Sequence, residues 1–186
     1  MLSMKIIYNS EELIDMIGPD GMVTEPVELM IGEEYHGLDE LKSLDNVTLV
    51  EGCKLYDLTS VTSLDNVTLV EGCYLHGLNS VASLDNVKVV EGCVLAGLES
   101  VPRISNCSLG EGCTLAGIDN GVEINNSIIK KGFKVWSGWG IDTVLGAVIN
   151  CTLGEGLILK GCDELKAEDL KTCTIGDGVI LDGFLG

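Results

Sequence analysis

Hydrophobic positions along this chain recur every twenty residues. The segment LDNVTLVEGC at residues 44–53 is repeated without change at 64–73, and LDNVKVVEGC at 84–93 and ISNCSLGEGC at 104–113 are further copies. Within a copy, apolar residues first alternate with polar ones, which predicts short strands with one face inward. They then fall three residues apart, which predicts an extended segment. Each repeat is therefore expected to form one coil of two short strands, each followed by a turn, and an extended return.

The copies align on the first inward position of each coil. This position is occupied by Val27, Val47, Val67, Val87, Cys107, Ser127, Cys151 and Cys173. Five intervals of 20 residues are followed by one of 24 and one of 22, and the extra residues fall around 136–146 and 164–169. Repeats that contact only their neighbours build solenoids. The sequence thus predicts an all-β fold, namely a single-domain β-solenoid or parallel β-helix of about eight coils.

Small and amide residues mark the corners of each predicted coil. The first turn always holds glycine: Gly32, Gly52, Gly72, Gly92, Gly112, Gly132, Gly156 and Gly178. The second turn holds Gly37, Asp57, Gly77, Gly97, Gly117, Ser137, Gly161 and Gly183. An invariant glycine predicts a positive φ or no room for a Cβ atom, and aspartate is a residue type that tolerates a positive φ. The first strand is preceded by asparagine, at Asn46, Asn66, Asn86, Asn106, Asn126 and Asn150, and we expect these amides to hydrogen-bond from coil to coil.

The N-terminal residues do not share the repeat. Residues 5–8 predict a short strand, and residues 11–17 predict a short helix with carboxylates in its first turn. A solenoid needs its first coil covered, because apolar side chains and strand edges otherwise meet water. We therefore assign residues 1–22 as an N-terminal cap with a strand and a helix, and residues 23–186 as the β-solenoid repeats.

The C-terminal sequence stops directly after a predicted strand. An open end would expose Val179, Leu181 and Phe184, and exposed apolar surface of this kind seeks a partner. We expect two chains to pair end to end through this last coil, as a homodimer.

The repeat resembles several solenoid families. An asparagine column at a corner is similar to that of right-handed parallel β-helix proteins, and CTLGEGLIL at 151–159 and CTIGDGVIL at 173–181 resemble hexapeptide-repeat left-handed helices. The Leu-x-x-Val-x-Leu spacing resembles leucine-rich repeats, and the Val-x-Gly pattern resembles receptor L-domains. The resemblance covers residues 23–186. It implies a β-solenoid and does not single out one family.

The chain is strongly acidic, with a formal net charge of −18. Residues 1–100 contain 4 Lys or Arg and 18 Asp or Glu, whereas residues 101–186 contain 7 and 11. Nucleic-acid binding requires a basic surface, so direct binding to DNA or RNA is not expected. The charge favours solubility in general and, as a more specific reading, a protein partner with a basic surface.

The sequence also bears on where the protein is expected to act. No apolar run approaches the ~18 residues of a membrane span. The first residues lack the charged, apolar and small-residue regions of a signal peptide. We therefore expect a cytoplasmic protein with no membrane partner, in the host cytoplasm if the chain is viral.

The eight cysteines favour a core role over disulfides or metal binding. Cys53, Cys73, Cys93 and Cys113 share one column, Cys107, Cys151 and Cys173 share another, and Cys162 lies in a third. Cβ atoms of stacked neighbours are ~4.8 Å apart and parallel, which disfavours a disulfide. Convergent cysteine pairs of the zinc-binding kind do not occur. We expect reduced buried thiols, no metal and no cofactor.

Two columns of carboxylates and two tryptophans are the candidate partner-binding residues. The first column holds Glu51, Glu71, Glu91 and Glu111, continues with Glu155 and Asp177, and is broken by Ile31 and Lys131; the second holds Asp45, Asp65 and Asp85. Trp136 and Trp139 lie at the first insertion, beside a basic patch of Lys130, Lys131 and Lys134 that we interpret as part of a contact loop. Like charges on neighbouring coils repel. The columns are either solvated turns or a line of carboxylates that imitates a phosphate backbone.

These features lead to three hypotheses. The first is a non-enzymatic acidic protein-binding solenoid, which by analogy with pentapeptide-repeat DNA mimics would be a phage-encoded inhibitor of a nucleic-acid-binding host-defence protein. The second is a structural or adhesive surface repeat protein. The third is a carbohydrate-active β-helix enzyme, which predicts an acid cluster around residues 136–146. His36 and His76 lie in a column of aromatic residues without a candidate nucleophile, so no catalytic residue is predicted.

Overall fold

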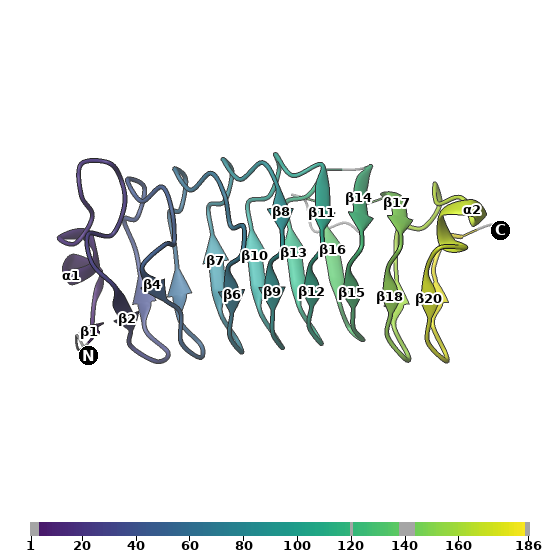
Figure 1. Ribbon diagram of the computed structural model, residues 1–186, viewed down its shortest axis with the longest axis horizontal. Coiled ribbons are helices and arrows are strands. Elements are labelled where there is room, and N and C mark those ends of the chain that lie inside the picture. Colours follow the sequence, from purple (N-terminus) through teal and green to yellow (C-terminus); the bar gives the residue numbers. More distant parts are fainter. Residues whose placement is uncertain (1–3, 120, 138–143, 185–186) are drawn as a thin grey trace.

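The computed structural model describes residues 4–119, 121–137 and 144–184 and confirms the predicted fold. Short parallel strands stack coil upon coil into an elongated β-solenoid of about eight turns, with the two termini at opposite ends (Figure 1). Helix makes up only 5% of the chain. The described residues contain two short helices, α1 (Ser10–Ile14) and α2 (Ala167–Leu170).

The strands form stacks along three faces of the solenoid. The first face holds β1 (Lys5–Ile7), β2 (Val27–Leu29) and β4 (Val47–Thr48), followed by β6 (Thr68–Leu69), β9 (Lys88–Val89), β12 (Ser108–Leu109), β15 (Ile128–Ile129), β18 (Thr152–Leu153) and β20 (Thr174–Ile175). The second face holds β3 (Glu34–Tyr35), β5 (Lys54–Leu55), β7 (Tyr74–His76), β10 (Val94–Ala96), β13 (Thr114–Ala116) and β16 (Lys134–Trp136), then the separate pair β19 (Ile158–Leu159) and β21 (Ile180–Leu181). The third face holds β8 (Leu84–Asp85), β11 (Arg103–Ser105), β14 (Val122–Asn125) and β17 (Leu145–Ile149).

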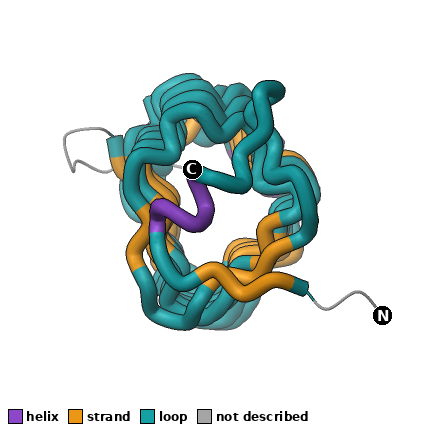
Figure 2. The backbone as a smooth tube through the Cα atoms, turned by 90° about the vertical axis from the view of Figure 1, so that its left-hand side faces the viewer, coloured by secondary structure: helices purple, strands orange, loops and turns teal. Residues whose placement is uncertain are grey.

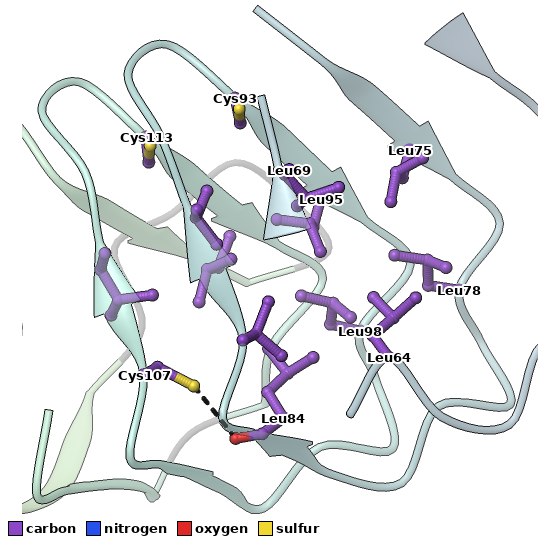
Figure 3. Close-up of a cluster of buried hydrophobic side chains, with 14 of the residues drawn as sticks. Leu64, Leu69, Leu75, Leu78, Leu84, Cys93, Leu95, Leu98, Cys107 and Cys113 are labelled. Carbon is purple, nitrogen blue, oxygen red and sulfur yellow. Dashed lines mark hydrogen bonds between the residues drawn. The ribbon is translucent and has the colours of Figure 1, made fainter. Parts of the chain in front are cut away.

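Equivalent residues of successive coils lie directly above one another in the core. Leu75 pairs with Leu95, and Leu95 pairs with Leu115. All three side chains are fully buried. Figure 3 shows leucines of neighbouring coils stacked in the interior, with Cys107 among them. Burial of this apolar surface, at roughly 25 cal/mol per Å², is the main force that holds the coils together.

The glycine columns have the backbone that the sequence predicts. Every glycine of the first turn has a positive φ, between 65° at Gly156 and 73° at Gly32 and Gly132. In the second turn Asp57 has a φ of 63°, so aspartate replaces glycine in the left-handed region. Its carboxylate Oδ2 also accepts a hydrogen bond of 2.9 Å from the Gly37 N–H.

The asparagine column has a different role from the expected amide ladder. All six members have a positive φ, from 50° at Asn126 to 67° at Asn46. Asparagine is one of the few side chains that enter this region at low cost. The side-chain amide of Asn46 donates to the Val23 carbonyl at 2.9 Å, but amide-to-amide bonds along the column do not occur among the described residues. The residues are therefore corner formers.

At the N-terminal end, β1 extends the first face by pairing in parallel with β2. Helix α1 follows, with Asn9 as its N-cap and Leu13 fully buried. Figure 2 shows this helix lying across the end of the tube. The helix is shorter than the predicted 11–17, because the chain turns after Ile14 and Ile17 forms a bridge to Val23 instead.

At the C-terminal end the predicted dimerisation residues belong partly to the core. Val179, Leu181 and Phe184 are half-buried and pack against the core cluster. The more exposed apolar residues of the last coil are Ile175 and Ile180, with 49% and 54% of their surface accessible. Pairing of two chains through this coil stays a prediction.

Candidate functional site

The first candidate site is a row of glutamates on the turn between the first and second faces. We call Glu51, Glu71, Glu91 and Glu111 the acidic edge. Each lies just before a first-turn glycine, and its backbone carbonyl accepts the N–H of the glycine one coil earlier. The Gly52–Glu71, Gly72–Glu91 and Gly92–Glu111 bonds measure 2.9, 3.0 and 2.9 Å. The backbone thus fixes the register of the row, while all four side chains are exposed.

The glutamates of the acidic edge form no ion pair with any described residue. Within the part of the chain that the structure describes, ion pairs join Lys54 to Glu34 at 2.6 Å and Arg103 to Glu123 at 3.4 Å, and none involves the acidic edge. The Lys54 ammonium lowers the pKa of Glu34 through a hydrogen bond and its charge. Glu51, Glu71 and Glu91 therefore follow one another along the rod with only carboxylates as column neighbours, whereas Glu111 has Lys131 as the next residue of its column.

The second acidic column is more closely tied to the fold. Asp45 and Asp65 are exposed and Asp85 is half-buried. The carboxylate of Asp65 accepts a hydrogen bond from the backbone N–H of Asp85 at 3.2 Å. The Asp45 N–H donates to the Ser43 hydroxyl at 3.0 Å instead. The structure therefore places the two predicted columns on either side of the first face, with a partly structural role for the aspartates.

The predicted tryptophans are not part of these columns. Trp136 lies on β16 of the second face, is half-buried, and has the Lys134 ammonium 5.5 Å from its ring centroid, a cation–π contact. Trp139 lies outside the described residues. Further along the same face, the rings of His36 and Tyr56 stack with centroids 4.5 Å apart, as the aromatic column predicts.

The second candidate site is a break in the second face, which we call the split. At the other junctions of this face an N–H of one coil donates to a carbonyl of the coil before it. Examples are Tyr74 to Cys53 at 3.0 Å, Lys134 to Cys113 at 2.9 Å and Ile180 to Leu157 at 2.9 Å. The corresponding groups of Ile158 and Phe133 are not joined, and β16 and β19 belong to different sheets in the described chain.

A cleft of about 450 Å³ opens at the split. It is lined by Gly132, Phe133, Lys134, Val135, Trp136, Ile158, Leu159 and Lys160. The lining is apolar, aromatic and cationic, and its described residues include no carboxylate. The acid cluster that the enzyme hypothesis predicts is not among them. Sequence reasoning found Lys134 and Trp136 but missed the opposite wall, although the 24-residue interval was its signal.

The cysteines are all in the described residues, and all eight are free thiols. Seven are buried and Cys173 is half-buried, so the expectation of reduced core cysteines is confirmed. Cys107 donates to the Leu84 carbonyl at 3.3 Å (Figure 3) and also lies 3.2 Å from the Ser105 carbonyl. Burial raises the pKa of Cys107 and of Cys151 to about 11, and that of Cys162 to about 12. These thiols are therefore protonated and unreactive at neutral pH.

Comparison of the chain with protein-family models, with curated proteins and with solved structures gives no match in any of the three. Over the described ranges, no group of three His, Cys, Asp or Glu side chains is arranged to hold a metal ion. The two helices of the described chain are too short to cross a bilayer. Inference about function therefore rests on the two sites themselves.

Proposed function

We propose that this chain is a non-enzymatic binding scaffold whose acidic edge docks against a basic surface of another protein. The observation that carries the proposal is the in-register, exposed and unpaired row of Glu51, Glu71, Glu91 and Glu111. Stacked coils hold such charges ~4.8 Å apart, where they repel one another. A partner's lysines and arginines would relieve this repulsion on binding. The carboxylates would then contribute favourable electrostatic free energy to the complex.

The specific form of the proposal is imitation of a nucleic acid. Over the three coils that carry both an aspartate and a glutamate, the two columns give one charge per ~2.4 Å of rod, compared with one per ~1.7 Å for double-stranded DNA. The two densities are similar enough for a groove that binds the phosphate backbone to accept the rod. The partner would then be a nucleic-acid-binding protein, such as a defence protein that a phage-encoded inhibitor blocks.

The test is affinity capture from lysate with the immobilised protein, followed by identification of the bound partner. Binding should be strong at ~0.05 M salt and weak at ~0.5 M salt, because salt screens exposed charges. Double-stranded DNA should displace the partner in proportion to its concentration. A partner that stays bound in excess DNA would overturn the nucleic-acid form of the proposal.

A matched pair of variants tests the acidic edge itself. Neutralising it with Glu51→Gln, Glu71→Gln, Glu91→Gln and Glu111→Gln should abolish capture. The control neutralises four other exposed carboxylates, with Asp39→Asn, Glu99→Gln, Asp119→Asn and Glu164→Gln, which removes the same net charge away from the edge. If both variants lose the partner equally, net charge rather than the edge is responsible, and the docking proposal fails.

A further inference from the structure

The split leaves main-chain groups without the partners that all other junctions of the second face supply. Among the described residues, no N–H reaches the Phe133 carbonyl as Lys134 reaches that of Cys113, and no carbonyl accepts the Ile158 N–H as Leu157 accepts that of Ile180. The adjoining turn is open as well. Gly112 donates to Lys131 at 3.0 Å and Gly156 to Asp177 at 2.9 Å, but in the described chain no such bond joins Gly132 to the next coil.

The split is a local interruption of strand pairing, and the solenoid continues on both sides of it. On the first face β15 pairs with β18, where Ile128 lies opposite Thr152. On the third face β14 pairs with β17, where Ile124 lies opposite Val148. Two faces therefore hold the two coils in contact, while the remaining face presents two facing, unpaired strand edges. Unpaired edges are templates for another strand.

We propose that the split binds an extended acidic peptide segment of a partner protein, which adds as a strand between β16 and β19. Addition of a strand supplies donors and acceptors to both edges at once. A small anion could meet the lysines of the cleft but would leave the Phe133 carbonyl and the Ile158 N–H unpaired. Both groups lie on the open edges of strands beside the cleft, and Ile158 is 51% exposed. A peptide backbone can supply a donor and an acceptor to the two edges together, so the geometry favours a peptide.

The side chains around the split indicate which peptide fits. Lys134 and Trp136 point outward from β16, while Val135 between them is 7% exposed and points into the core. On the opposite wall Leu159 is buried and Lys160 also lines the cleft. A strand in register therefore alternates acidic, apolar and acidic residues. One of its carboxylates meets the Lys134 ammonium on the outer rim, and its apolar residue fills the space between Val135 and Leu159.

This site is independent of the acidic edge, and the charges involved are opposite. In a chain of net charge −18, an acidic segment is repelled by most of the surface. The cationic rim of the split would attract it locally, and the preference should weaken with salt. A failure of this proposal would leave the proposed function of the acidic edge unaffected.

The test uses a blocked peptide of sequence Thr-Glu-Val-Glu-Thr, followed by backbone amide NMR of the full chain. The changes in amide chemical shift should concentrate on β16 and β19 and should reach a plateau as the peptide concentration rises. The Lys134→Glu variant should weaken binding about tenfold, the equivalent of one lost charge pair. The control Lys88→Glu makes the same charge change on β9 of the first face and should leave the affinity within about twofold.

Peptide variants keep the test decisive even if a protein variant folds poorly. Methylation of the valine backbone nitrogen removes a strand donor and should abolish binding, while leaving the carboxylates unchanged. A Thr-Lys-Val-Lys-Thr peptide should not bind. The proposal is overturned if the methylated peptide binds as tightly as the parent, if Lys88→Glu weakens binding as much as Lys134→Glu, or if no peptide-dependent shift occurs at β16 and β19.

Discussion

The carboxylate of Asp65 accepts a hydrogen bond of 3.2 Å from the backbone N–H of Asp85, one coil further along the rod. Two residues that appear in the sequence as equivalent surface charges are thus joined, because the coils stack in register at a spacing of twenty residues. This contact shows that the two acidic columns have different roles in the fold. The Asp65 carboxylate contributes to the stacking of the coils, whereas the exposed glutamates of the acidic edge contribute only their backbone to it.

Replacement of Asp65 by alanine should destabilise the protein by about 0.5–1.5 kcal/mol, the usual net value of a hydrogen bond. The matched control is Asp45→Ala, one coil earlier, because the Asp65 N–H above it donates to the Ser63 hydroxyl at 2.9 Å rather than to the carboxylate. Urea denaturation followed by circular dichroism measures both. Equal free energies of unfolding for the two variants would show that the Asp65–Asp85 contact contributes nothing.

Neutralising the acidic edge should have the opposite effect on stability. Removal of the like charges at Glu51, Glu71, Glu91 and Glu111 relieves repulsion of roughly 0.2–1 kcal/mol per neighbouring pair. The quadruple glutamine variant should therefore unfold at higher urea concentration than the parent at low salt. The difference should shrink at ~1 M salt, where the Debye length is ~3 Å. A variant less stable than the parent at both salt concentrations would contradict this account of the edge.

Most of the architecture could be predicted because the repeat places chemically similar residues in columns. Inward leucines, valines and cysteines define strands, and glycine at every first turn defines a positive φ. Stacking then converts sequence intervals into contacts, such as the His36–Tyr56 ring stack. The columns also located the acidic edge, because the residue before an invariant glycine has to be on the outside of the turn.

The split could be located but not described from the sequence. The 24-residue interval indicates that one coil departs from the pattern, but it does not say which of the three faces opens. Ile158 and Leu159 follow Gly156 just as Lys134 and Val135 follow Gly132, so the pattern alone predicts normal pairing there. The predicted amide ladder of the asparagine column was also wrong. Asparagine is expected at this corner whether it forms a ladder or only adopts a positive φ, so the sequence could not distinguish the two roles.

The two glycine columns should differ in their tolerance of alanine. Gly92 has a φ of 69° and open space around an added Cβ atom, so Gly92→Ala should cost only the ~1–2 kcal/mol of the left-handed backbone. Gly97 has a φ of 91°, and a Cβ atom there would lie 2.7 Å from the Leu78 backbone nitrogen. Thermal unfolding should show a clearly larger loss for Gly97→Ala.

The comparison of these glycines has an internal control. Gly92→Asn should be less costly than Gly92→Ala, because Asn86 already holds a φ of 58° in the same coil. If Gly97→Ala and Gly92→Ala reduce the melting temperature equally, the close approach of neighbouring coils at the second turn does not limit the side chain.

The buried thiols should make the protein sensitive to alkaline pH. Burial raises the pKa of Cys107 from its ordinary value near 9 to about 11, so the folded chain keeps a proton that the unfolded chain releases. The stabilisation is fully present below pH 9 and is lost as the pH rises to 11, with an upper limit of ~2.7 kcal/mol for this thiol. The free energy of unfolding should fall over this window.

Cys107→Val provides the matched variant, because the same column holds Val87 one coil earlier. Its free energy of unfolding should decline less steeply between pH 9 and pH 11 than that of the parent. Urea titrations at several pH values measure the slope. Parallel pH profiles for the two proteins would contradict a contribution from this thiol.

Tyr35 should link the N-terminal strand to the first coil. It occupies the inward position that Leu55 and Leu75 hold in the next coils, and its hydroxyl donates to the Ile7 carbonyl at 2.8 Å and accepts the Met30 N–H at 2.9 Å. Tyr35→Phe should cost about 0.5–1.5 kcal/mol. The cost stays moderate because Met30 also donates directly to Ile7 at 3.0 Å.

The loss of stability in Tyr35→Phe should be confined to the N-terminal end, and amide hydrogen exchange of β1 is the measurement that shows this. Amides of β1 should exchange faster in Tyr35→Phe, while those of β10 and β13 in the middle of the rod keep their protection, since repeat proteins couple mainly to nearest neighbours. Tyr8→Phe is the control, because Tyr8 is 52% exposed. Faster exchange along the whole rod would show instead that the N-terminal segment stabilises all coils together.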